Sequence, residues 1–270
     1  MHRCSRGFIL LHLLMTFGLA TAARADSSGF PLISPPIPFP RFELGSLDNK
    51  LTGSYLHITD QTASFGGGSV DYKGRYAPFS WLAVGLELPV IYLTGNLGAV
   101  GNNGDESYWT LAPVLNLQVQ VVNSPDFSLL LFGGYNLTYG NGSVDETDQG
   151  QEANLDFSAI TRGYTVGAQA GIPLGHGIVF APSYMFTRNY GGTMSTTITL
   201  VGVPMPPMTD SMPIGGFTSH AVGFDIILPQ PWLSIGALVH QLVKSQDAGE
   251  AVRVAMLQLA YHFGDVKPFN

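Results

Sequence analysis

Charged residues recur at every second position of the stretch SVDYKGRYA, which spans residues 69–77. Asp71, Lys73 and Arg75 would share one face of a β-strand, because successive strand residues point to opposite sides. Glu87 lies on the next strand-like stretch, and a hairpin would bring it within one or two rungs of Lys73. Such mixed charges can line a water path and tune its selectivity, or they can pair and close the space between the strands. The ionisable residues predicted on this inner face are Asp71, Lys73, Arg75, Glu87, Asp225 and His262.

A second set of acidic residues lies in GNGSVDETDQGQEANLD, residues 140–156. Its carboxylates could bind Ca²⁺ or Mg²⁺, and Asp145, Glu146 and Asp148 are weak candidates for such a site. Their spacing does not fit the twelve-residue EF-hand pattern, and runs of charge are usually solvated. We therefore expect a solvated acidic loop, and the sequence implies no cofactor.

The dipeptide Ser219-His220, followed by Asp225, resembles the residue types of a hydrolytic triad. Strand alternation places His220 on the face opposite to Ser219 and Asp225, so the three side chains cannot converge. We therefore expect no enzymatic activity.

The first 25 residues have the pattern of a secretory signal peptide. Basic residues precede an apolar core from Phe8 to Ala20, and Ala23-Arg24-Ala25 fits a cleavage site after Ala25. The single cysteine, Cys4, lies in this segment, so the mature chain would form no disulfide. The signal also removes three arginines and no acid, which leaves the mature chain more acidic than the formal charge of −7. An acidic chain without basic clusters is a poor partner for nucleic acid.

The mature chain combines few charges with strict alternation. Charged residues make up 11% of the sequence, whereas soluble domains contain about 25%. In WTLAPVLNLQVQVV, residues 109–122, one alternate row is large and apolar, and the other is mostly small or amide-bearing. Small and polar side chains suit the interior of a narrow barrel, and the apolar row suits lipid. The pattern thus predicts an all-β, transmembrane, antiparallel up-and-down barrel; an exported soluble β-sandwich is the alternative.

Ten alternating segments support this prediction. They lie near residues 48–59, 68–77, 80–93, 107–122, 127–140, 155–172, 177–190, 216–229, 232–243 and 251–263. Short connections alternate with longer ones at 94–106, 141–154 and 191–215, as in bacterial outer-membrane barrels. The last of these holds four methionines, and Thr193–Val203 could form a hairpin arm. A phase slip is expected near Thr161-Arg162-Gly163.

The predicted organisation has four parts. Residues 1–25 are the signal peptide, 26–47 a Pro-rich periplasmic leader, 48–263 the barrel and 264–270 a C-terminal extension. The leader contains PLISPPIPFP, whose five prolines favour an extended polyproline conformation. We expect a stiff spacer, with a plug or a partner-binding arm as the alternative.

Two stretches resemble the strands of bacterial outer-membrane barrels: WLAVGLELPVIYL (81–93) and PDFSLLLFGGYNLTYGNG (125–142). They are similar in particular to the MetA-pathway phenol-degradation family of transporters, which carry a Gly-rich strand ending in Glu-Leu-Pro. The family's usual proline before a later Thr-Gly is missing here, where Leu137-Thr138-Tyr139-Gly140 stands instead. The resemblance implies an outer-membrane barrel that passes small hydrophobic compounds, and it supplies no catalytic residue.

The sequence therefore predicts a Gram-negative outer-membrane barrel for the passage or uptake of small, in particular hydrophobic, solutes. Its expected partners are outer-membrane lipids, such solutes and the barrel-assembly machinery. The alternative is a closed barrel with a structural or surface-interaction role through its extracellular loops.

Overall fold

The computed structural model describes residues 42–59, 63–97, 106–148, 151–229, 233–244 and 253–264. The described strands are β1 (Leu47–Thr59), β2 (Ala63–Phe79), β3 (Leu82–Leu97), β4 (Glu106–Leu111), β5 (Val114–Asn123), β6 (Ser128–Asp148), β7 (Gln151–Gly175), β8 (Ile178–Leu200), β9 (Met208–Ile214), β10 (Phe217–Ile227), β11 (Leu233–Lys244) and β12 (Arg253–Gly264). In the described part of the chain, no helix is long and apolar enough to cross a membrane.

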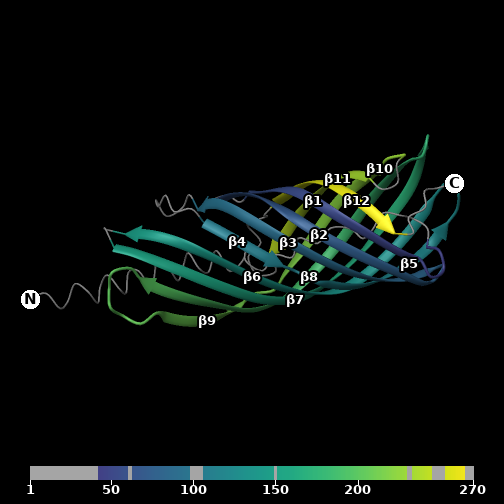
Figure 1. Cartoon of the computed structure of the whole chain (residues 1–270). Coiled ribbons are helices and arrows are strands. Elements are labelled where there is room, and N and C mark those ends of the chain that lie inside the picture. Colours follow the sequence, from purple (N-terminus) through teal and green to yellow (C-terminus); the bar gives the residue numbers. More distant parts are fainter. Residues whose placement is uncertain are drawn as a thin grey trace, which may run out of the picture.

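The strands form a closed antiparallel barrel with ten strand positions around its wall (Figure 1). We call each of these positions a stave. Strands β4 and β5 are two halves of one stave, because both pair with β3 and with β6. They are separated at Ala112-Pro113, where proline has no N–H to donate to the ladder. Strands β9 and β10 likewise follow one another along β8. Pairing of β1 with β12 closes the barrel, so the ten segments predicted from alternation are confirmed.

The two ends of the barrel differ. The β2–β3, β5–β6, β7–β8 and β10–β11 connections lie at one end, with the start of β1 and the end of β12; we call this the short-turn end. At the opposite, long-hairpin end, β6 to β9 extend further than the sequence predicted. β6 continues to Asp148 and β7 starts at Gln151, so the predicted loop 141–154 is wrong, and most of 191–215 is also strand.

Hydroxyl pairs explain why alternation did not reveal the β8–β9 hairpin. Ser195 and Ser211 face each other with their oxygens 2.9 Å apart, and the Thr197 and Thr209 hydroxyls are 3.1 Å apart. Such cross-strand pairs stabilise a ladder without an apolar row. The hairpin predicted within Thr193–Val203 is wrong in its bounds, because residues 193–200 belong to the single strand β8 and its partner β9 begins only at Met208.

Burial alternates as the opening pattern of β5 predicts. Leu115 and Leu117 are 62% and 55% exposed, whereas the alternating Asn116 and Gln118 are 4% and 2% exposed. The large apolar row therefore faces outward, and the small and polar row faces the interior. Aromatic residues near strand ends are also exposed, namely Trp81, Tyr92, Trp109, Phe127, Tyr139, Tyr190, Tyr261 and Phe263, while Trp232 lies outside the described residues. An apolar exterior bordered by aromatics is the pattern of a transmembrane barrel.

A register shift between β7 and β8 lies beside Thr161–Gly163, but the phase slip predicted for residues 155–172 is wrong, because β7 keeps odd-numbered buried positions on both sides of it, as at Ala159 and Thr165. Thr161 pairs with Gly192 and Gly163 with Asn189, so β8 contributes one extra residue. Gly191 has a φ of 85°, and its N–H donates to Asn189 Oδ1 at 2.7 Å. After this bulge the buried positions of β8 shift from odd to even numbers, as at Met194 and Thr196.

Candidate functional site: the barrel interior

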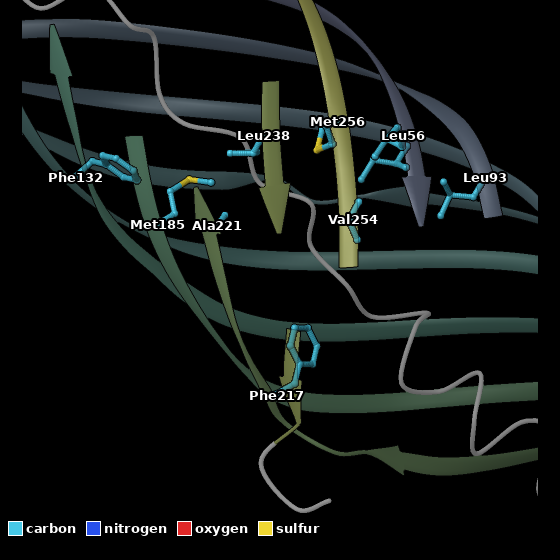
Figure 2. Close-up of a cluster of buried hydrophobic side chains, with 10 residues drawn as sticks. Leu56, Leu93, Phe132, Met185, Phe217, Ala221, Leu238, Val254 and Met256 are labelled. Atoms are coloured by element: carbon cyan, nitrogen blue, oxygen red, sulfur yellow. The ribbon is translucent and has the colours of Figure 1, made fainter. Parts of the chain in front are cut away.

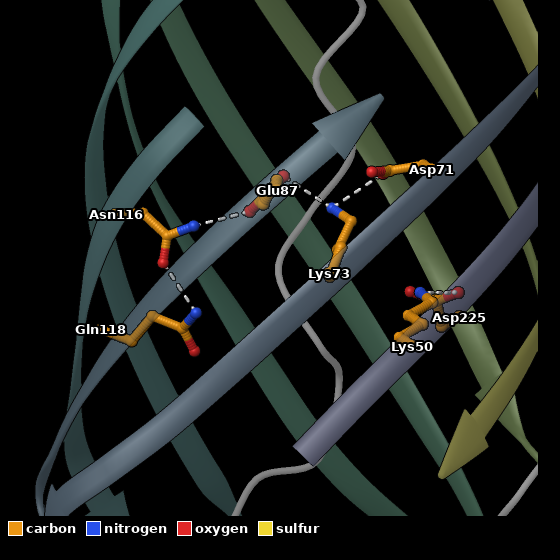
Figure 3. Close-up of polar contacts among 7 residues, drawn as sticks. All are labelled: Lys50, Asp71, Lys73, Glu87, Asn116, Gln118 and Asp225. Atoms are coloured by element: carbon orange, nitrogen blue, oxygen red, sulfur yellow. Dashed lines mark hydrogen bonds and ion pairs between the residues drawn. The ribbon is translucent and has the colours of Figure 1, made fainter. Parts of the chain in front are cut away.

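Five of the predicted inward charges belong to one buried group, which we call the charged layer: Asp48, Lys50, Asp71, Lys73, Arg75, Glu87 and Asp225. At its centre, Lys73 Nζ lies 2.9 Å from Glu87 Oε2 and 3.3 Å from Asp71 Oδ2 (Figure 3). The pairing of Lys73 with Glu87 on β3 brings the first two together, as the hairpin argument predicted. All three residues are at most 4% exposed. A lysine so deeply buried depends on its two carboxylates for compensation of its charge.

Amides extend this group to the next stave. Asn116 Nδ2 donates to Glu87 Oε1 at 2.8 Å, and Gln118 Nε2 donates to Asn116 Oδ1 at 2.8 Å. Both amides come from the inward row of β5 (Figure 3). One continuous polar chain therefore runs from β2 across β3 to β5.

A second ion pair reaches across the interior. Lys50 Nζ on β1 lies 3.5 Å from Asp225 Oδ1 on β10 (Figure 3). Two strands, β11 and β12, separate β1 from β10 along the wall, so this pair joins parts of the barrel that are not neighbours. Lys50 is completely buried and Asp225 is 2% exposed.

Arg75 closes the layer toward the short-turn end. Its guanidinium Nε lies 3.0 Å from Asp48 Oδ2, and its Nη2 donates to the same oxygen. The guanidinium carbon also lies 4.8 Å from the centre of the Phe42 ring, a cation–π contact. Phe42 is 3% exposed, packs with Ala77, Ala83 and Leu130, and donates its N–H to Gln120 Oε1 at 3.1 Å. The chain just before β1 therefore occupies the short-turn mouth.

His262 is inward, as predicted, and only 1% exposed. Its Nε2 lies 2.8 Å from the Ser234 hydroxyl on β11. The residue is opposite Lys50 in the register of β1 and β12, so it stands at the level of the charged layer.

Toward the long-hairpin end the inner wall becomes apolar. Along β1 the inward residues are Lys50, Thr52, Ser54 and then Leu56, in that order. Leu56 belongs to a cluster around the inner wall that we call the apolar layer (Figure 2). It contains Leu56, Ile91, Leu93, Phe132, Met185, Phe217, Ala221, Leu238, Val254 and Met256, with Tyr108 packed against it. None of its ten buried members is more than 8% exposed.

Sequence reasoning missed Asp48, Lys50, Phe42 and the apolar layer, and it placed Asn116 and Gln118 in the inward row without assigning them to the site. Asp48 and Lys50 stand at alternate positions like Asp71 and Lys73, so the same rule applied to the first strand would have found them. Phe42 had no such signal, since it precedes the barrel and its place depends on a turn. The apolar layer was hidden because its members are scattered, one to two per strand.

The remaining candidates do not form a site in the described residues. Asp145, Glu146 and Asp148 lie on strand backbone at the end of β6, and their side chains are outside the described part. Elsewhere in the described part, no group of three or more His, Cys, Asp or Glu residues could hold a metal ion. Ser219 and Asp225 are buried in the interior, whereas His220 is exposed on the exterior, so these three do not converge.

Comparison with known proteins assigns no function to the chain. No family model and no curated protein sequence matches the chain. The outer membrane protease OmpT from Escherichia coli is 11% identical, with 83% of this chain and 95% of that chain covered and a TM-score of 0.45. The translocator domain of the autotransporter NalP from Neisseria meningitidis is 8% identical, with 80% and 88% covered and a TM-score of 0.49. The COG4313 outer membrane channel from Pseudomonas putida F1 is 11% identical, with 86% and 100% covered and a TM-score of 0.44. These proteins are a protease, a translocator and a channel, so the likeness carries no argument for any one activity.

Proposed function

We propose that this protein is an outer-membrane barrel of a Gram-negative bacterium that takes up small apolar solutes. In bacterial outer-membrane barrels the short turns are periplasmic and the longer connections extracellular. The apolar layer would then face the outside and the charged layer the periplasm. The proposal includes no enzymatic step.

The observation that carries this proposal is the apolar layer itself. The interior of a membrane barrel is ordinarily polar, because its water-filled or hydrogen-bonded contents require it. Here Leu56, Phe132, Met185 and Leu238 come from four different staves and together make one section of the inner wall apolar (Figure 2). Such a wall favours an apolar solute over an ion, since desolvation is unfavourable only for the ion.

The charged layer argues that ions do not pass through the barrel in this state. Among the described residues, the Lys73 and Lys50 pairs leave no exposed charge at their level, and Phe42 occupies the mouth beyond them. Passage to the periplasm therefore requires the charged layer or Phe42 to move, or the solute to leave sideways between strands.

The test uses vesicles whose outer leaflet is rich in lipopolysaccharide, which slows the entry of apolar molecules. The refolded protein should speed the fluorescence rise of 1-N-phenylnaphthylamine inside them, while planar bilayers show little ion conductance. Ala221→Phe would place a larger side chain within the apolar layer, of which Ala221 is a member, and should slow probe entry. Ala255→Phe, at an exposed position on β12, is the matched control and should leave entry unchanged. Equal rates for wild type and Ala221→Phe would overturn the proposal.

A closed barrel with a structural or surface-interaction role is the second candidate. It is favoured by the Lys50–Asp225 pair, which ties non-neighbouring staves across the interior. It predicts neither probe entry nor conductance from a protein that is demonstrably folded in the membrane.

The same proposal includes the localisation and the partners of the protein. We predict export through a signal peptide cleaved after Ala25, insertion by the barrel-assembly machinery and contact with outer-membrane lipids. Membership of the MetA-pathway family also stays a prediction, and the hydrophobic cargo expected for that family agrees with an apolar layer.

A further inference from the structure

Two arginines lie on the outward face of the barrel, where contact with lipid makes a charged side chain unfavourable. Arg162 on β7 and Arg188 on β8 are both exposed. Arg188 is opposite Tyr164 on β7 and Thr218 on β10, and Arg162 is two residues from Tyr164 on the same face. We call Arg162, Tyr164, Arg188 and His220 the outer basic patch.

Aromatic rings place this patch at the edge of the apolar exterior. The Tyr164 ring lies 5.8 Å from that of Tyr190 and 6.3 Å from that of Phe186. Tyrosines gather at the level of the lipid headgroups, and the cost of an outward arginine falls from the bilayer centre toward that level. Beyond Arg162, toward the long-hairpin end, the outward residues of β7 are the exposed Ile160, then Ser158 and the exposed Asp156. The patch therefore lies where lipid gives way to water.

The arginines lack an acidic partner in the described structure. Every ion pair found among the described residues lies in the charged layer, and neither Arg162 nor Arg188 belongs to one. On β7 the next outward acid, Asp156, is six positions from Arg162, about 20 Å along the strand. No acidic residue of this part of the chain is paired with them.

Neighbouring groups add hydrogen-bonding capacity. His220 on β10 is exposed and its Nδ1 lies 2.7 Å from the Tyr184 hydroxyl. Its ring also packs against Phe186 at 5.3 Å, so its position is held from two sides. A guanidinium fork binds phosphate through two parallel hydrogen bonds, and hydroxyl and imidazole groups beside it can bind sugar hydroxyls.

We propose that the outer basic patch binds the phosphate of a phosphorylated glycolipid of the outer leaflet. This uses the membrane orientation given under the proposed function and is otherwise independent of solute uptake. The bound lipid neutralises Arg162 and Arg188 and covers the part of β7, β8 and β10 that carries them.

Native mass spectrometry of the folded protein tests this with two lipids, bisphosphorylated lipid A and the same lipid A without its phosphates. Wild type should retain the phosphorylated form at least about tenfold more tightly, since charge-assisted pairs are lost with the phosphates. The variant Arg162→Gln/Arg188→Gln should lose this preference. His57→Gln, at an exposed basic position on β1, should keep it.

Equal retention of the two lipids by wild type overturns the proposal without any variant. Full retention of lipid A by the double variant, or retention of phosphatidylglycerol to the same extent as lipid A, also overturns it. Because no solute crosses the membrane in this experiment, its failure leaves the uptake proposal to its own test.

Discussion

The charged layer and the apolar layer lie on the same inner wall, and strands β1, β3 and β10 carry residues of both, yet different forces stabilise them. In the charged layer, Lys73 is compensated by two specific atoms at 2.9 and 3.3 Å. In the apolar layer, Leu56 and its neighbours make many weak contacts with no required partner. Alternation decides only that a residue points inward; the residue type decides whether its burial depends on one partner or on many.

Lys73→Met should give the largest effect on this comparison. It leaves Glu87 and Asp71 buried without their cation, which costs about 3–5 kcal/mol of unfolding free energy when one partner of a buried pair is removed. Urea unfolding in lipid vesicles, followed by tryptophan fluorescence, measures it. Lys73→Met/Glu87→Gln should be more stable than the sum of its single changes. A loss below about 1 kcal/mol in the single variant would mean that water reaches this layer.

Leu56→Ala should come next, because it removes a side chain that is completely buried in the apolar layer. Large-to-small changes of this kind cost about 2–5 kcal/mol when the surroundings cannot collapse, and we expect about 3 here. The same unfolding experiment applies. The volume-conserving Leu56→Met is the control and should cost less than about 1.5 kcal/mol. If Leu56→Ala is no worse than Leu56→Met, the layer borders open space.

Gly191→Ala should cost about 1–3 kcal/mol, the range for backbone strain at a sparsely populated conformation. Gly191 has a φ of 85°, and an added Cβ would collide with the Ile214 carbonyl oxygen. This variant tests whether the change of buried positions on β8, from odd to even numbers beyond the two layers, depends on the bulge at Gly191. Gly202→Ala is a useful comparison, since Gly202 has a φ of 75° but an added Cβ there would meet no atom within 4 Å. Equal unfolding free energies for Gly191→Ala and Gly202→Ala would mean that the close approach of Gly191 to the Ile214 carbonyl oxygen does not affect stability.

Tyr184→Phe should have the smallest effect. It removes the 2.7 Å hydrogen bond to His220 on the exterior, and a typical side-chain hydrogen bond contributes about 0.5–1.5 kcal/mol. The stability loss can be compared with that of Lys73→Met, because Tyr184 and His220 form a polar pair on the outer wall and Lys73 and Glu87 form one on the inner wall. Unfolding of Tyr184→Phe, His220→Ala and the double variant gives the coupling between them. A coupling as large as that of Lys73 and Glu87 would contradict the difference between the walls.

Sequence patterns predicted much of the fold and part of the site. The inward positions of Asp71, Lys73, Arg75, Glu87, Asp225 and His262 followed from period-two alternation, and all six are buried. The β8–β9 hairpin did not, because hydroxyl pairs such as Ser195–Ser211 stabilise it without an apolar row. Phe42 was hidden because a turn at 44–45 brings it back to the mouth.

The sequence by itself determined which side chains face inward and which face lipid, because each strand residue has only two faces to choose from. Tertiary structure alone decided which side chains meet. Lys50 and Asp225 are 175 positions apart, and only closure of the barrel through β12 and β1 brings them to 3.5 Å. The same closure gathers scattered apolar residues into one layer above the charges. Register and closure are set by backbone pairing over the whole barrel, and no local stretch of sequence contains that information.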